Sequence, residues 1–282
     1  MLSVVIPARD AARWIGSALA SVHAQDGIAF DAVIVVDDGS HDGTAAIARA
    51  AGAQVIAGPG NGPSAARNAG VAACDSEYIA FLDADDMWPD NSLLPRLQQL
   101  AAHPDAAFVF GDCRQFDDRD GRRYPHVRTV FEQSGCSEAL FGDAARVMQP
   151  LAALLDADFV TTGSVIMRRS VFVTLGGFDT RLRRVEDLDL WLRAAASHAV
   201  LWHPGLALLR RRHGGNLSAD AAAMLEAHIA VLERVAKLPQ AAALAARLRG
   251  LRRRDRRALA GLLWSRGQRL VGLASLLRAW AS

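Results

Sequence analysis

Two short apolar runs, Leu2–Ile6 and Ala32–Val36, constrain the fold more than any other feature of the sequence. Both are continuous and rich in β-branched side chains, a pattern typical of strands that helices cover on both faces. Residues 11–24, between the two runs, carry apolar side chains at helical spacing, and residues 44–51 predict a second helix. Since strand–helix–strand connections within one sheet are right-handed, this region predicts parallel core strands of an α/β sheet.

The alternation of strands and helices continues along the chain. Further strands are predicted at 54–57, 77–82, 106–111 and 164–167, and further helices at 64–73, 91–102 and 145–155. From about residue 220 onward the pattern is helical throughout, with breaks expected at Pro239, Gly250 and Gly267. The expected architecture is one α/β domain with a mostly parallel central sheet and a helical C-terminal tail.

Composition limits the class of protein. Apolar residues make up 51% of the chain and charged residues 22%, as in globular proteins, and no run of eighteen apolar residues lacks a charge. We therefore expect no membrane span, and the absence of a basic leader before the first strand favours the cytoplasm. The net charge of +2 is too small to indicate nucleic-acid binding. Cys74, Cys113 and Cys136 are too widely spaced to predict a disulfide framework or a thiolate metal site.

Acidic residues follow two of the predicted strands. Asp37 and Asp38 come after the second strand, and Asp83, Asp85 and Asp86 come after the strand at 77–82. In open α/β sheets, ligands bind beyond the carboxyl ends of the strands. Carboxylates two residues apart at such an end can share a hard divalent cation that bridges two phosphates.

Two other interpretations of this acidic cluster stay open on these residues alone. Acids are common in turns, and they cap the helix that follows a strand. An Asp-x-Asp nucleophile of the phosphatase kind is the other alternative, but it usually lies on the first strand with a threonine downstream. Here Met87 and Trp88 follow the cluster.

The order of five motifs is more specific than any one of them. The motifs are Val4-Val5-Ile6-Pro7, Val35–Ser40, Gly62–Gly70, Phe81–Asp86 and Glu186–Trp191. In this order they resemble glycosyltransferase family 2, and the resemblance covers residues 2 to about 218. It implies the Rossmann-like GT-A fold of nucleotide-diphosphosugar transferases. By this resemblance residues 1–218 form the catalytic domain, with a nucleotide-sugar-binding half at 1–111 and an acceptor-side half at 112–218. Residues 219–282 would be a basic helical C-terminal extension.

The resemblance also implies a donor site. Asp38 is expected to accept a hydrogen bond from the base, for which uracil N3–H is suitable, and Pro7 to shape the pocket floor. Asp83 is expected near the ribose, while Arg67 contacts the diphosphate or fixes the neighbouring loop. Each has a simpler alternative: Asp38 caps the next helix, Pro7 ends the first strand, and Arg67 is solvated on a half-exposed helix.

A metal site follows from the same resemblance. Asp85 is expected to be the principal ligand of Mg²⁺ or Mn²⁺, with Asp86 behind it or capping a helix. His213 is a candidate additional ligand or diphosphate contact, since imidazole can supply a position that carboxylates leave open. Among three arginines, His213 is equally well interpreted as a surface residue.

Inverting transfer requires a carboxylate that removes the proton of the attacking hydroxyl. Asp187 matches the family's Glu-Asp position and is the expected base, with Glu186 orienting it. The alternative is that the two acids stabilise a helix start through its dipole, worth about 0.3 to 1 kcal/mol. Thr162 and Trp191 are candidate acceptor or orienting residues.

The resulting hypothesis is an inverting transferase that moves a single sugar from a nucleotide-diphosphate sugar, with a UDP-sugar favoured. The acceptor would be a hydroxyl of a glycan or a lipid-linked glycan, in cell-surface polysaccharide synthesis. Nucleotidyl transfer on a related fold, or a non-catalytic nucleotide-binding module, are the alternatives. The arginine-rich tail predicts either peripheral contact with the inner face of the membrane or a solvated charged face.

Overall fold

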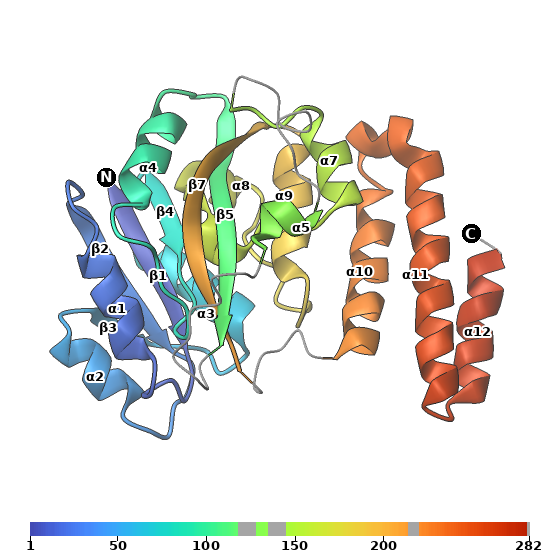
Figure 1. Cartoon of the computed structure of the whole chain (residues 1–282), viewed down its shortest axis with the longest axis horizontal. Helices are drawn as coiled ribbons and strands as arrows, with labels where there is room; N and C mark the ends of the chain where they lie inside the picture. The colour runs from blue at the N-terminus through green and yellow to red at the C-terminus, as the bar shows by residue number, and fades with distance from the viewer. Residues whose placement is uncertain (118–127, 135–144, 214–219, 281–282) are drawn as a thin grey trace.

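A seven-stranded mixed sheet with the order β3-β2-β1-β4-β6-β5-β7 forms the centre of the molecule (Figure 1). The computed structural model describes residues 1–117, 128–134, 145–213 and 220–280. The strands are β1 (Leu2–Ala8), β2 (Phe30–Asp37), β3 (Gln54–Ala57), β4 (Tyr78–Phe81), β5 (Ala106–Asp117), β6 (Ile166–Arg168) and β7 (Ala199–Arg212). All adjacent pairs are parallel except those that β6 makes with β4 and β5. The sheet is therefore mostly parallel, as predicted.

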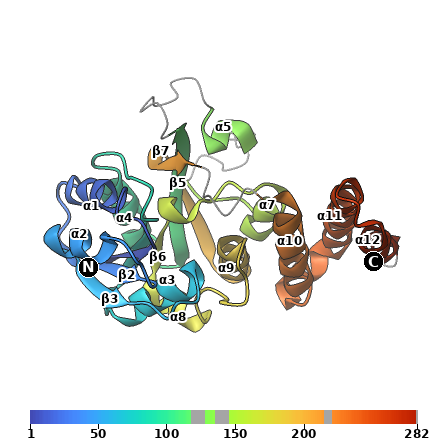
Figure 2. The same cartoon turned by 90° about the horizontal axis from the view of Figure 1, so that it is seen from below.

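Helices cover both faces of this sheet. Figure 2 shows α1, α2 and α4 on one side and α3, α8 and α9 on the other. The helices of this body are α1 (Ile15–His23), α2 (Thr44–Ala50), α3 (Pro63–Ala72), α4 (Leu93–Ala101), α5 (Val130–Ser134), α7 (Pro150–Asp156), α8 (Arg169–Thr174) and α9 (Glu186–Ala195). Along β1, Val4 and Ile6 enter the core on one face while Val5 enters the core on the other. Two-sided burial of this kind explains the continuous apolar runs.

A helical layer lies beyond α9 at the C-terminal end of the chain (Figure 1). It consists of α10 (Ala221–Val235), the 3-10 helix η3 (Pro239–Leu244), α11 (Ala245–Ser265) and α12 (Arg269–Trp280). Val231 and Leu232 of α10 join the same core cluster as Leu190 and Leu192 of α9. In the described part of the chain, no helix combines the length and apolar character that crossing a bilayer requires.

Three predicted elements differ from the structure in the middle of the chain. The strand expected at 106–111 continues to Asp117 in β5. The helix expected at 145–155 begins only at Pro150, because Ala145 and Gln149 have positive φ angles of 54° and 48°. Arg146 instead forms an isolated bridge with Leu201 of β7. The strand expected at 164–167 is shorter, since residues 162–164 form the 3-10 helix η1 and β6 starts at Ile166.

The tail is also more continuous than predicted. Gly250 does not break α11, which runs without interruption from Ala245 to Ser265. Pro239 starts η3, and Gly267, with a φ of 77°, forms the turn between α11 and α12. The predicted boundary at 218/219 lies outside the described residues, as does Cys136. Cys74 and Cys113 are buried free thiols.

Candidate active site

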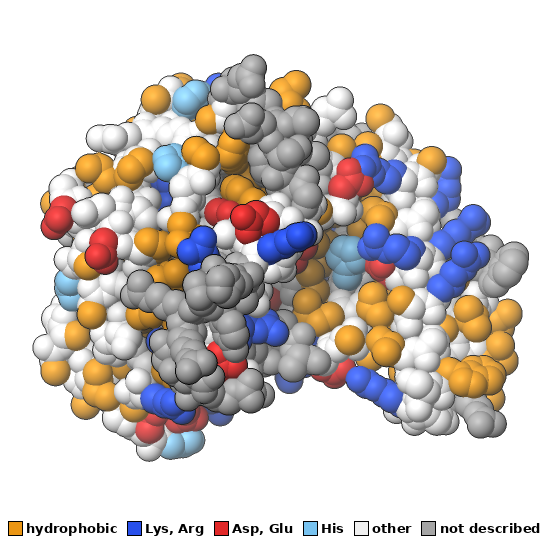
Figure 3. Space-filling model, in the orientation of Figure 1, with side chains coloured by type: hydrophobic (Ala, Val, Ile, Leu, Met, Phe, Trp, Pro, Cys, Tyr) orange, Lys and Arg blue, Asp and Glu red, His pale blue; other side chains and the backbone are white. Residues whose placement is uncertain are grey.

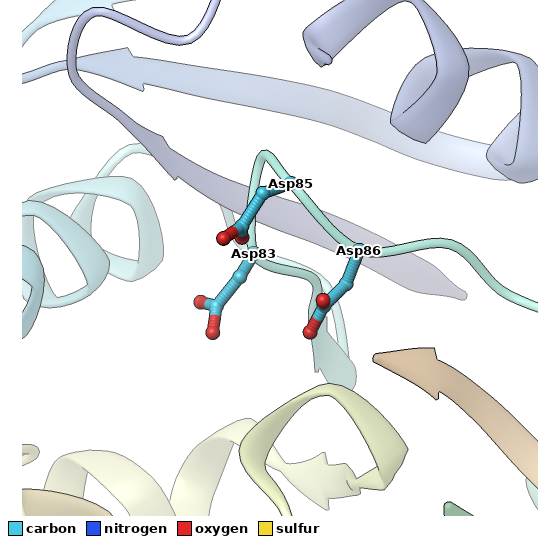
Figure 4. A group of neighbouring side chains, drawn as sticks. All are labelled: Asp83, Asp85 and Asp86. Atoms are coloured by element: carbon cyan, nitrogen blue, oxygen red, sulfur yellow. The ribbon is translucent and has the colours of Figure 1, made fainter. Parts of the chain in front are cut away.

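The predicted acids meet at the carboxyl edge of the sheet, where β1, β2 and β4 end. β1 and β2 are parallel and in register to their last residues, with Ala8 opposite Asp37. Asp38 follows β2 directly, and its N–H donates to the Ala8 carbonyl at 2.8 Å. The loop after β4 carries Asp83, Asp85 and Asp86, whose side chains are shown in Figure 4. Topology therefore brings together acids that lie far apart in the sequence.

Asp38 is buried and is bound to the loop that follows β3. Its two carboxylate oxygens accept the N–H groups of Gly60 at 2.7 Å and Gly62 at 2.8 Å. It does not cap α2, because Asp42 accepts the Thr44 N–H at the start of that helix. A methyl group at Gly58 would lie 2.6 Å from Asp38 Oδ1, so this packing requires glycine there. The helix-capping alternative for Asp38 is wrong.

Pro7 lies inside β1 rather than at its end. It is buried and pairs with Val36, and the strand continues to Ala8. The alternative that Pro7 terminates the strand is therefore wrong.

The three acids after β4 form a compact cluster. One carboxylate oxygen from each of Asp83, Asp85 and Asp86 lies within 4.8 Å of the others. Burial, and then the charges of Asp85 and Asp83, raise the pKa of Asp86 well above its ordinary value. Asp86 does not cap a helix, since its Oδ1 accepts the N–H of Arg211 at 2.7 Å. Three crowded carboxylates fit a hard divalent cation, which prefers oxygen ligands and offsets their repulsion.

His213 joins this acidic cluster from β7's end. Its Nε2 lies 2.8 Å from Asp85 Oδ2, and its ring stacks on Trp14 with centroids 4.4 Å apart. Arg211 also holds this loop, with Nε donating to the Asp85 carbonyl at 2.7 Å. His213 is thus packed into the cluster rather than lying free on the surface. The carboxylates suit Mg²⁺ or Mn²⁺, and the imidazole adds a nitrogen donor beside them.

Arg67 connects the acidic cluster to the start of α9. Its guanidinium is 4% exposed and donates to Asp83 Oδ1 at 2.6 Å and to Glu186 Oε1 at 2.9 Å. Phe178 lies under it, 5.3 Å from ring centroid to Cζ. Burial lowers the pKa of Arg67, but the charges of Asp83 and Glu186 outweigh this, so its pKa lies above the ordinary value. Arg67 is not a solvated surface residue.

Asp187 lies beside Glu186 in the first turn of α9, after Val185 with a φ of 58°. It is half-buried, and its Oδ2 accepts the hydroxyl of Thr162 at 3.0 Å. Its Oδ1 accepts the N–H of Leu188 at 2.8 Å. Burial, followed by the charge of Asp187, raises the pKa of Glu186. Thr162 therefore orients Asp187, and Arg67 holds Glu186.

Trp191 does not reach this site. It is fully buried and packs against Phe108, with ring centroids 5.0 Å apart, and against Phe178 at 6.2 Å. The expectation of an acceptor contact at Trp191 is corrected: its apolar spacing in α9 is that of a core residue.

Two charged residues of the site were not singled out from the sequence. The side chain of Asp158 reaches solvent. Desolvation of its carboxyl by the surrounding protein, and then the charge of Asp187, raise its pKa to about 7. Arg210 of β7 is half-buried, and it interacts electrostatically with Asp86, Asp83 and Asp187. The sequence carried no signal for either residue, because their surroundings depend on Asp187 and on β7, a strand that the local sequence does not predict.

The sheet order and the placement of this site define a GT-A transferase fold, which solved structures share. One of them is TarS 1–349 of S. aureus in complex with UDP-GlcNAc. That structure is 19% identical with a TM-score of 0.64, covering 93% of this chain and 71% of TarS 1–349. The mannosyltransferase PcManGT from Pyrobaculum calidifontis, in complex with GDP-Man and Mn²⁺, is 18% identical with a TM-score of 0.66, covering 100% of this chain and 75% of PcManGT.

The profile of glycosyl transferase family 2 matches residues 3–176, and the chain belongs to this family. Succinoglycan biosynthesis protein ExoU of Rhizobium meliloti is 31% identical over 251 residues, which are 81% of this chain and 68% of ExoU. The amylovoran biosynthesis glycosyltransferase AmsB of Erwinia amylovora is 28% identical, over 68% of this chain and 63% of AmsB. The chain spans only 43% of the pre-mycofactocin glycosyltransferase of Mycobacterium tuberculosis, at 28% identity over 75% of this chain.

Proposed function

We propose that this chain is a metal-dependent, inverting glycosyltransferase that moves a single sugar from a nucleotide-diphosphate sugar, with a UDP-sugar favoured. The acceptor is a hydroxyl of a glycan or lipid-linked glycan in cell-surface polysaccharide synthesis. One observation carries the proposal: the buried Arg67 binds both Asp83 of the acidic cluster and Glu186 beside Asp187. The names of AmsB and ExoU, which refer to polysaccharide biosynthesis, support the class of product.

Asp85 and His213 would hold the divalent cation, Mn²⁺ or Mg²⁺, with Asp83 beside them. Asp85 and Asp83 are 26% and 37% exposed, whereas Asp86 is buried and already bound to Arg211. When bound, the cation offsets the charge that develops on the leaving diphosphate. The Mn²⁺ in the PcManGT structure supports this choice of metal.

Asp187 acts as the base in this proposal. Its carboxylate takes the proton of the acceptor hydroxyl while that oxygen bonds to the anomeric carbon. The bond from the anomeric carbon to the phosphate oxygen breaks on the opposite face, so configuration inverts and the nucleoside diphosphate leaves with the electron pair. Thr162 holds Asp187 in orientation, and Arg67 keeps Glu186 from turning away.

The donor is held by the residues at the carboxyl ends of β1 and β2. Asp38 contacts the base, with Pro7 below it, and Asp83 lies near the ribose. Because two carboxylates take up the guanidinium of Arg67, we propose that it positions the site rather than gripping the diphosphate. Arg210, a half-buried cation among acids, is the better candidate for contact with phosphate.

Nucleotidyl transfer is less well supported. It would require a glycine-rich, basic phosphate loop after the first strand, and residues 8–12 contain no glycine. A non-catalytic nucleotide-binding module would have no use for Asp187 fixed by Thr162 at the edge of the donor site.

Release of nucleoside diphosphate from a panel of nucleotide sugars, with Mn²⁺, Mg²⁺ or a chelator, tests the proposal. We expect release from one donor, dependent on metal, and loss of release in Asp85→Asn. Asp75→Asn is the matched control, because Asp75 is fully exposed and distant in the fold at the other end of β4. Release that survives both the chelator and Asp85→Asn contradicts the metal-dependent proposal.

A further inference from the structure

The last two helices pack against one another in an unusual way. Small residues of α12 pack against α11. At Gly272 the two helices are so close that a methyl group there would lie 3.1 Å from the Ala260 carbonyl. The Ser275 hydroxyl donates to the Arg256 carbonyl at 3.0 Å, and Ala279 is 1% exposed. The side of α12 that faces the protein therefore carries almost no apolar bulk.

The large apolar side chains of α12 point outward instead. Leu270, Val271, Leu273 and Leu277 are 84%, 57%, 47% and 63% exposed. Amphipathic surface helices ordinarily bury such residues. Leu270 and Val271 border a groove shared with α10, whereas Leu273 and Leu277, one turn apart, are not among its lining residues. An outward apolar face of this kind indicates contact with another apolar phase.

Arginines run along α11 next to this apolar face. Arg249, Arg253, Arg257 and Trp264 are spaced by four, four and seven residues, so they lie on one exposed side of the helix. Residues 239–282 contain ten arginines and a single acid, Asp255. That acid is 3% exposed and paired with His228. The face is therefore strongly positive.

The basic and apolar parts are neighbours on the molecular surface. Figure 3 shows Lys and Arg side chains gathered over the upper part of α11 and α12, and hydrophobic side chains over the lower part near their connecting turn. We name the set Arg249, Arg253, Arg257, Trp264, Leu273 and Leu277 the hairpin face.

We propose that the hairpin face docks on an anionic lipid bilayer. Apolar side chains enter the boundary between headgroups and acyl chains, while arginines are attracted to the lipid phosphates, and tryptophan suits that boundary. A second copy of this chain fits less well, since a symmetric contact would bring the two rows of arginines together. The inference is independent of the proposed catalysis.

Flotation of the full chain with vesicles tests the inference. We expect binding to vesicles of phosphatidylglycerol and phosphatidylcholine in equal parts, weaker binding at high salt, and little binding to phosphatidylcholine alone. Leu273→Ser with Leu277→Ser is expected to lower the partition coefficient about tenfold or more. Arg249→Gln with Arg253→Gln is expected to lower it about tenfold.

Two double variants serve as matched controls at exposed positions elsewhere. Met148→Ser with Val173→Ser removes two exposed apolar side chains, and Arg49→Gln with Arg114→Gln removes two exposed arginines. Both should bind like the parent. Equal binding to the two kinds of vesicle, or equal losses in controls and hairpin variants, overturns the proposal. So does a stable dimer without lipid that Leu273→Ser with Leu277→Ser dissociates, because the face then belongs to a second copy.

Discussion

Arg67 joins the acidic cluster to the first turn of α9 through Asp83 and Glu186. Because it is buried, we expect it to contribute strongly to stability. Removing one partner of a buried ion pair costs about 3 to 5 kcal/mol, because a charge is left uncompensated. Since Asp83 is 37% exposed, we expect Arg67→Met to lower the free energy of unfolding by about 3 kcal/mol, the low end of that range. Urea denaturation measures the change.

The partner left uncompensated is chiefly Glu186, which is 12% exposed. Arg67→Met combined with Glu186→Gln should therefore recover part of the lost stability. If the free energy of unfolding of the double variant is no higher than that of Arg67→Met, the ion pair is not the source of the loss.

The raised pKa of Asp158 predicts that stability depends on pH between about 4 and 7. Its pKa is raised from the ordinary 3.8 to about 7 by the surrounding protein and by Asp187. The folded protein thus holds a proton that the unfolded chain releases between about pH 4 and 7. Its contribution to stability is complete below that window and is lost as the pH rises through it.

Compared with the parent, Asp158→Asn should therefore become relatively more stable as the pH rises from 4 to 7. Denaturation midpoints across this range measure the difference. A difference that does not change with pH would contradict the raised pKa of Asp158.

Helix α11 contains a glycine, Gly250, whose surroundings do not require the absence of a side chain. A methyl group at Gly250 would meet nothing within 4 Å, and the residue is exposed within a continuous helix. Gly250→Ala should raise the free energy of unfolding by roughly 0.5 to 1 kcal/mol, because alanine loses less conformational entropy in a helix. Thermal unfolding tests this, with Gly58→Ala as the contrasting variant, which should destabilise by displacing Asp38.

The elements that the sequence predicts best are those with two-sided burial. β1, β2 and β4 were expected close to their observed bounds, and the acids at their carboxyl ends followed from that. β7 was not expected, because Pro204, Gly205 and three consecutive arginines hide its strand pattern. Its conformation depends on pairing with β5, a contact that local sequence does not express.

Parts of the site were hidden for a related reason. Locally Arg67 looks like a basic residue on a half-exposed helix. Its burial depends on Asp83 and on Glu186, which is 119 residues away in the sequence. Trp191 showed the converse: lying next to the Glu-Asp motif suggested a site residue, whereas its helical spacing points into the core.

Ion pairs connect the C-terminal helices α10 and α11 to the body that carries the site. Arg234 of α10 binds Asp179 and lies 3.2 Å from Asp189 Oδ1 of α9, and Arg247 of α11 pairs with Asp156 of α7. Arg181 first, and also Arg234, hold the pKa of Asp179 well below its ordinary value. If the hairpin face binds a bilayer, these contacts fix the orientation of the site relative to the lipid surface.

The most direct test of the account is a comparison of turnover and donor binding in Asp187→Asn. The proposed base touches the acceptor and not the donor, so turnover should fall by about 10² to 10⁴-fold. Donor affinity, measured by calorimetry with metal present, should stay close to that of the parent and of Asp75→Asn. Unchanged turnover, or a loss of donor binding large enough to explain the loss of turnover, would contradict the assignment of Asp187 as the base.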